Sequence, residues 1–125
     1  MKEQVNIRAD EARKTLKATL LCELDHHAAR EIREQIDEAT RTFLPDLLVL
    51  DFSQVAFMDS SGVGLILGRL ALCERYGANL ALTGLSPALL RLLRMAGIEK
   101  MPHLFIDAAS ASEKEGDEKE RIGIR

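Results

Sequence analysis

The amino-acid sequence predicts an α/β fold, with a mixed, mostly parallel sheet of about four to five strands and helices packed on it. Strand-like and helix-like segments alternate along the chain, and such alternation is typical of sheets joined by right-handed crossovers. The run LLVLDF at residues 47–52 is compact and apolar, as expected for a central strand covered on both faces. A length of 125 residues with 46% hydrophobic residues fits one domain with one core.

The first half of the chain predicts two strands and a helix before that central strand. Val5 and Ile7 indicate a short strand, and residues 16–24 (LKATLLCEL) alternate with the two-residue period of a half-buried strand. Asp25 is a good N-cap, and the residues after it predict a helix over about 26–42 that ends at the sequence LPD. The apolar residues of that helix repeat at helical spacing: Ile32, Ile36, Ala39 and Phe43.

The second half continues the alternation. We expect a helix from about Ser60 to Tyr76, a strand at NLALTG (79–84), and a helix opened by Ser86 as N-cap with Pro87 at its first position. A last short strand is predicted near HLFI (103–106). From residue 108 the chain is rich in small and charged residues, so we expect a domain at 1–107 and a charged, flexible tail at 108–125.

Composition excludes several classes of function. The 17 basic and 20 acidic residues give a net charge of -3, and only 4% of the residues are aromatic, so nucleic-acid binding is not expected. No apolar run is long enough for a signal peptide or a membrane span, which predicts a cytoplasmic protein without a membrane partner.

The residues that could carry redox or metal chemistry do not form a recognisable site. Cys22 and Cys73 lack metal-ligand spacing and are interpreted as reduced core thiols. His26 and His27 are neighbours on a helix, and only His103 could join them, so we expect neither a metal nor a cofactor.

The stretch VAFMDSSGVGLILG (55–68) is the most informative one. Asp59 or Ser60 can cap the helix that starts here, and one cap would satisfy the need. The glycines at 62, 64 and 68 are less easily explained, because each costs about 1 kcal/mol in a helix relative to alanine. They either allow the helix to lie close to a strand or leave space above Ser60 for another molecule.

The same helix has two apolar sides. Its projection places Val63, Ile66, Leu67 and Leu70 on the side expected to face the core. The opposite side is formed by Leu65, Arg69, Leu72 and Tyr76. These residues either pack against a neighbouring helix or form a partner-binding surface, and both interpretations place Ser60 at one end of the stripe.

Three segments carry a family resemblance: ELDHHAAREIREQID (23–37), LVLDFSQVAFMDSSGVGLILGRL (48–70) and LSPALLRLLRMAGI (85–98). They resemble the bacterial anti-sigma-factor antagonists of the STAS domain class over roughly residues 5–106. The sequence MDSSG followed by a glycine-containing helix is specific to that class, and ELDHH is similar to its sporulation branch, which acts in the sigma-F pathway.

The resemblance implies a partner-switching regulator without catalysis of its own. In this family the antagonist binds an anti-sigma factor that is also a serine kinase, and so releases the sigma factor. The kinase phosphorylates the first serine after the motif aspartate, here Ser60, with Ser61 as the alternative acceptor, and a serine phosphatase of the PP2C type reverses the reaction. The implied partner-binding residues are Asp25, Asp59, Ser60, Ser61, Gly62, Leu65 and Arg69.

Other functions have less support. DSSGVG is not the G-x-S-x-G turn of a serine hydrolase, and GVGLILG has neither dinucleotide-binding spacing nor the ending of a phosphate loop. The main alternative is a different STAS module, a non-phosphorylated accessory subunit of a lipid-transport ABC system.

Overall fold

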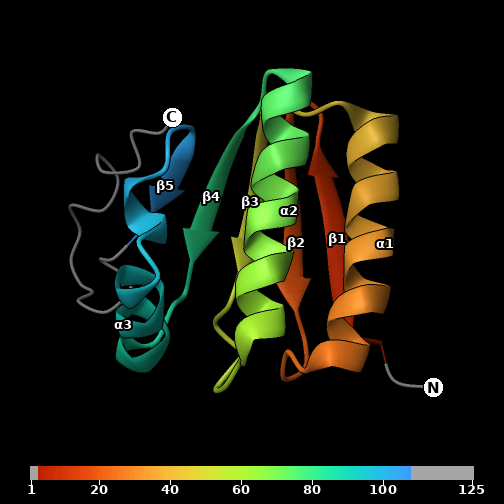
Figure 1. Ribbon diagram of the computed structural model, residues 1–125. Coiled ribbons are helices and arrows are strands. Elements are labelled where there is room, and N and C mark those ends of the chain that lie inside the picture. Colours follow the sequence, from red (N-terminus) through yellow and green to blue (C-terminus); the bar gives the residue numbers. More distant parts are fainter. Residues whose placement is uncertain (1–2, 108–125) are drawn as a thin grey trace, which may run out of the picture.

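The computed structural model describes residues 3–107. It contains five strands and three α-helices (Figure 1). In chain order the elements are β1 (Val5–Asp10), β2 (Thr15–Leu20), α1 (His26–Phe43), β3 (Leu47–Asp51), α2 (Ser60–Tyr76), β4 (Asn79–Thr83), α3 (Pro87–Met95), the short 3-10 helix η1 (Ile98–Lys100) and β5 (Leu104–Ile106).

The five strands form one mixed sheet in the order β1-β2-β3-β4-β5. The hairpin of β1 and β2 is antiparallel, and the three following pairings are parallel. The predicted mixed, mostly parallel sheet is therefore confirmed. Because β3 and β4 are parallel neighbours joined by a helix, α2 begins beyond the carboxyl end of β3.

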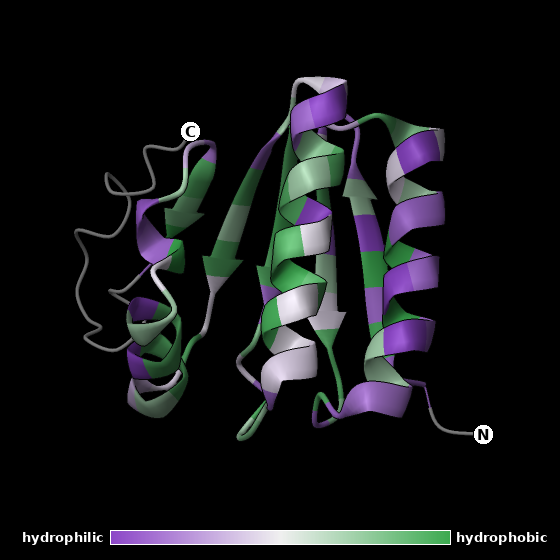
Figure 2. Ribbon diagram, viewed as in Figure 1, coloured by the Kyte–Doolittle hydropathy of each residue, from purple (hydrophilic) through white to green (hydrophobic). Residues whose placement is uncertain are grey.

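Helices α1 and α2 lie side by side over the same face of the sheet (Figure 1). The core between them and the strands is fully buried and aliphatic, and includes Leu48 and Leu50 of β3, Ile32 and Ile36 of α1, and Ile66 and Leu70 of α2. Hydrophilic residues follow the outward side of α1, whereas apolar and neutral residues dominate the outward side of α2 (Figure 2). The two helices therefore present different surfaces to their surroundings.

Local capping chemistry sets the helix ends as predicted. The Asp25 carboxylate accepts a hydrogen bond from the backbone of Ala28 at 2.9 Å, and the Ser86 hydroxyl accepts one from Leu89 at 3.1 Å. Pro87 occupies the first position of α3, where its missing N–H costs nothing. Helix α1 ends at Leu44, which adopts the left-handed conformation.

Two expectations about the strands need correction. Strand β2 ends at Leu20 rather than at residue 24, because the chain then turns toward α1 and Leu24 forms only an isolated bridge with Met58. The expected coverage of both faces of β3 is only partly confirmed. Leu48 and Leu50 are buried, but Leu47 and Val49 on the other face are half-buried, since α1 and α2 cover the same side. The predicted tail at 108–125 lies outside the described residues.

No helix among residues 3–107 is both long enough and apolar enough to cross a membrane.

Candidate functional site

The loop that leads into α2 is fixed against the loop that leads into α1. The backbone of Phe57 donates to the Glu23 carboxylate at 2.8 Å, and the adjoining Met58 pairs with Leu24 in a parallel bridge. Leu24 and Met58 are buried, so this contact is anchored in the core. As a result the starts of both helices lie at one end of the molecule (Figure 1).

Asp59, not Ser60, caps α2. The Asp59 carboxylate accepts a hydrogen bond from the backbone of Ser61 at 2.8 Å, and its carbonyl accepts one from Gly62 at 2.9 Å. The side chain of Ser60 is exposed, and within residues 3–107 its hydroxyl has no hydrogen-bond partner. The helix thus obtains its cap from Asp59 and leaves the Ser60 hydroxyl available to an incoming molecule.

Gly62 has a local structural reason. A Cβ atom at this position would lie 2.6 Å from Sδ and 2.7 Å from Cβ of Met58. The expected close approach therefore exists, but it is to the preceding loop and not to a strand. Gly64 and Gly68 differ, because a Cβ atom at either would meet nothing within 4 Å. Their side of α2 is open.

The prediction of which α2 residues face the core is partly wrong. The buried residues of the helix are Gly62, Leu65, Ile66, Arg69, Leu70 and Cys73. Leu67 is 38% exposed, whereas Leu65 and Arg69 are 3% and 5% exposed. The physical reason is the position of α1, which covers the flank of α2 that a helix lying on the sheet alone would leave in solvent.

Arg69 joins α2 to α1 through Asp37. Its Nη2 donates to Oδ2 of Asp37 at 3.0 Å, and its Nε lies 2.7 Å from Oδ1 as an ion pair too bent for a hydrogen bond. Its Nη1 also donates to the carbonyl of Leu65 at 3.2 Å. Burial lowers the pKa of Arg69, and Asp37 opposes that effect. The alternative that Leu65 and Arg69 pack against a neighbouring helix is thus the one observed.

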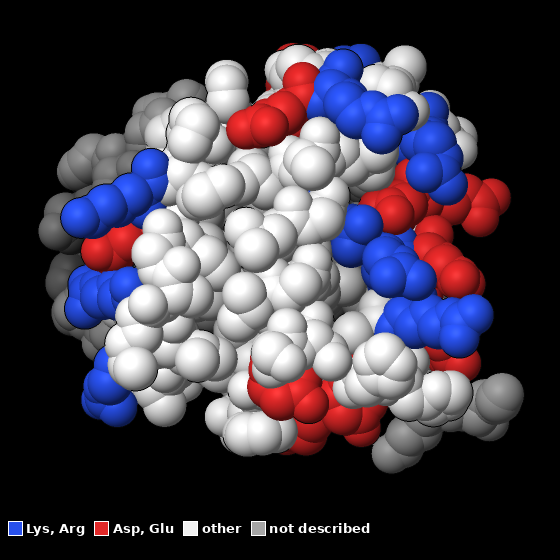
Figure 3. All heavy atoms as spheres, viewed as in Figure 1, with Lys and Arg blue, Asp and Glu red and all other residues white. Residues whose placement is uncertain are grey.

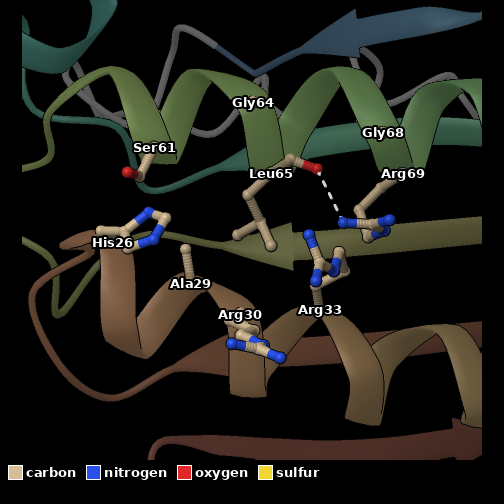
Figure 4. A pocket seen from close by; sticks show the side chains of 9 residues that line it. All are labelled: His26, Ala29, Arg30, Arg33, Ser61, Gly64, Leu65, Gly68 and Arg69. Atoms are coloured by element: carbon tan, nitrogen blue, oxygen red, sulfur yellow. Dashed lines mark hydrogen bonds between the residues drawn. The ribbon is translucent and has the colours of Figure 1, made fainter.

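A groove of about 610 Å³ lies between α1 and α2, directly beside the start of α2 (Figure 4). Its α1 wall is formed by His26, Ala29, Arg30 and Arg33, and its α2 wall by Ser61, Gly64, Leu65, Gly68 and Arg69. The Ser61 hydroxyl and the His26 ring face each other at one end (Figure 4). The groove therefore begins one residue from Ser60.

The surface around this groove is divided by charge. Figure 3 shows a broad uncharged area over α2, and basic side chains separate it from acidic ones on the α1 side. Near the start of α2, Phe57 is 59% exposed although its backbone is held by Glu23. An exposed aromatic ring on a fixed loop is a feature of protein-binding surfaces.

The structure brings together most of the residues predicted for the site. Asp25, Asp59, Ser60, Ser61 and Gly62 gather at the paired helix starts, whereas Leu65 and Arg69 lie further along the inter-helix groove. Sequence reasoning missed Arg30, Arg33 and Phe57. The two arginines stand three residues apart on α1, a spacing that places side chains on one face.

The cysteine and histidine side chains form no metal centre in the part of the chain that the structure describes. Both cysteines are free, Cys73 buried and Cys22 half-buried. Burial raises the pKa of Cys73 to about 11. His27 lies 3.9 Å from Glu31, and His103 lies 3.2 Å from Asn79, so each faces a neighbour of its own.

Known proteins are similar to this chain over most of its length. The STAS domain family model matches residues 6–111. The anti-sigma F factor antagonist of Paenibacillus polymyxa is 36% identical over 107 residues, which cover 86% of this chain and 92% of that protein.

Two solved structures agree with this match. The anti-sigma factor antagonist SpoIIAA in its unphosphorylated form superposes with a TM-score of 0.65 at 28% identity, over 95% of this chain and 97% of the other. The Bacillus cell fate determinant SpoIIAA in the phosphorylated form gives a TM-score of 0.65 at 29% identity, over 94% and 98% of the two chains.

Proposed function

This chain belongs to the STAS domain family, and we propose that it is an anti-sigma-factor antagonist that binds an anti-sigma serine kinase and is switched off by phosphorylation of Ser60. Binding displaces the sigma factor from the kinase, and a PP2C-type serine phosphatase restores the antagonist. The chain itself acts as substrate and regulator. The similar proteins carry the name of anti-sigma factor antagonist, and one of the similar structures is a phosphorylated form.

The single observation that carries the proposal is the free hydroxyl of Ser60 at a helix start that another residue caps. A kinase can modify this hydroxyl without removing the cap, because Asp59 supplies it. A phosphate at Ser60 would add about -1.5 to -2 charge next to a helix N-terminus, whose N–H groups and dipole favour anions. The fold should therefore tolerate the modification.

Loss of binding then arises at the interface. Two like charges 4 Å apart at an effective dielectric of 20 repel by about 4 kcal/mol. A third of that value, about 1.4 kcal/mol, already lowers an affinity tenfold. The added charge is sufficient as a switch, and no rearrangement of the fold is required.

The first test is mass spectrometry of the purified protein after incubation with ATP and the anti-sigma kinase of the same genome. We expect one phosphate, mapped to Ser60 by peptide analysis, and none on the Ser60→Ala variant. Ser61→Ala is the matched control and should still be modified. Modification of Ser61 alone would move the acceptor by one residue. Absence of any phosphate with an active kinase would favour the non-phosphorylated accessory subunit of a lipid-transport ABC system.

A binding assay completes the test. Ser60→Ala should fold and bind the kinase, and addition of ATP should not release it from the kinase. Ser60→Asp should fold and bind the kinase at least about tenfold more weakly than the parent. Circular dichroism distinguishes a loss of binding from a loss of the fold. A loss of helical signal in Ser60→Asp would contradict a helix start that tolerates an anion.

A further inference from the structure

The groove between α1 and α2 contains positive charge that the fold does not use. Arg30 and Arg33 are exposed, and neither forms an ion pair with another residue between 3 and 107. Arg69 is the exception, since its guanidinium is occupied by Asp37 and by the carbonyl of Leu65. The chain as a whole has a net charge of -3, so this local excess of cations runs against its composition.

The cations of the groove also act on one another. The pKa of Arg69 is lowered mainly by burial, and the positive charge of Arg33 lowers it further. Asp37 is the one carboxylate that counters both effects. Figure 4 shows the nitrogen atoms of Arg33 and Arg69 turned toward each other across the groove. An anionic group placed between the helices would relieve this repulsion.

The shape of the groove indicates an elongated occupant. Gly64 and Gly68 are one helical turn apart on the α2 wall, and among residues 3–107 a Cβ atom added at either would meet nothing within 4 Å. Ala29 and Leu65 also line the groove, but both are buried and offer little apolar surface to an occupant. Glycines are unfavourable inside a helix, and with open space at their Cβ positions in the described part of the chain they allow another backbone to approach α2 closely.

We propose that this groove binds an acidic helical segment of a protein partner. Carboxylates three or four residues apart on that segment match Arg30 and Arg33, which are themselves three apart on α1. The proposal rests on the proposed function, because it assigns the segment to the anti-sigma factor.

The location of the groove connects it to the switch. Ser61 lines one end of the groove, and Ser60 directly precedes it, so a phosphate on Ser60 would add negative charge close to a site that selects for negative charge. The phosphate would repel the acidic segment and compete with it for the arginines. The partner is then released because the phosphate and the carboxylates of the acidic segment compete for the same arginines.

The test compares binding of the anti-sigma factor of the same genome to matched variants by calorimetry. The Arg30→Glu/Arg33→Glu double variant should bind about tenfold or more weakly, and Gly68→Leu, which fills the groove, should also weaken binding. The Arg91→Glu/Lys100→Glu double variant, at exposed positions of α3 and η1, is the charge-matched control and should bind as the parent does. Thermal unfolding of each variant confirms that the fold is retained.

Three outcomes would overturn the proposal, and they differ in whether they also contradict the proposed function. Unchanged binding of the groove variants would leave the proposed function intact and exclude the groove. Absence of binding by the parent protein would remove the proposed function together with the groove. Binding of ATP or of vesicles containing anionic lipid that depends on Arg30 and Arg33, with unchanged partner binding, would assign the groove to those ligands instead.

Discussion

At the scale of single residues, the glycines of α2 show that one residue type serves two purposes. Gly62 is required by the fold, because its Cα approaches Met58 more closely than a side chain allows. Gly64 lines the open groove, and a Cβ atom added there would meet no other part of residues 3–107 within 4 Å. The same substitution should therefore change the free energy of unfolding in opposite directions at these two positions.

We expect Gly62→Ala to destabilise the protein and Gly64→Ala to stabilise it. The first places a methyl group 2.6 Å from Sδ of Met58, and overpacking of this kind costs about 1–3 kcal/mol. The second fills empty space and gains about 1 kcal/mol of helix propensity. Chemical denaturation measures both. Equal stabilities for the two variants would show that Met58 moves away without cost.

At the scale of elements, Asp25 is the N-cap of α1, and an ion pair with a partner is the second role that we propose for it. Its carboxylate caps the helix through the backbone of Ala28. It also lies at the same end of the molecule as Ser60, because Leu24 and Met58 join the two loops. The two roles differ in what they require, since a cap needs only an oxygen acceptor and an ion pair needs the charge.

Asp25→Ser and Asp25→Ala should separate these roles. Serine retains the cap, so its unfolding free energy should stay close to that of the parent, whereas alanine should lose about 1 kcal/mol. If Asp25 pairs with a basic residue of the kinase, both variants should bind it more weakly and to a similar degree. Parent-like binding by the Ser variant would restrict Asp25 to capping.

The contact between α1 and α2 depends on a partly buried ion pair. Arg69→Met should destabilise the protein by about 3 kcal/mol, because Asp37, whose side chain keeps only 17% exposure, would lose its counter-charge. The Arg69→Met/Asp37→Leu double variant should recover most of that loss, since two apolar side chains leave no unpaired charge. Thermal denaturation of the single and double variants checks this, and additive losses would argue against direct coupling.

At the scale of the whole molecule, most of the fold follows from local sequence chemistry. Asp25, Asp59 and Ser86 cap helices through their own backbone neighbourhoods, so their positions could be read from the chain. The orientation of α2 could not be predicted in this way, because which of its residues are buried depends on where α1 lies. Periodicity alone does not give the position of a neighbouring helix, so it places Leu67 on the core side and leaves open whether Arg69 packs against a helix or faces a partner.

The residues of the candidate site also differ in whether they could be predicted from the sequence. The residues around Ser60 are contiguous in sequence and could be predicted from the motif and its resemblance. Arg30 and Arg33 could not, because charged residues on an amphipathic helix usually face solvent, and only the packing of α2 turns their face into a groove wall. The coverage of β3 is a further example, since a continuous apolar run does not state which face a helix takes.

The burial of Cys73 makes the stability of the whole domain sensitive to alkaline pH. Its folded pKa of about 11 lies above the ordinary value of 9.0, so the unfolded chain loses the thiol proton first as pH rises. The contribution of this thiol is fully present below pH 9.0 and is lost as pH rises toward about 11. The loss should amount to about 3 kcal/mol of unfolding free energy.

Urea denaturation at a series of pH values measures this loss, and Cys73→Ala is its control. Alanine creates a cavity, so the variant should be less stable at every pH, but its stability should decline less steeply between pH 9.0 and about 11. Cys22→Ala tests the specificity, because that thiol is only half-buried. Parallel profiles for the parent and Cys73→Ala would show that Cys73 does not cause the alkaline loss and that the core around it admits the thiolate.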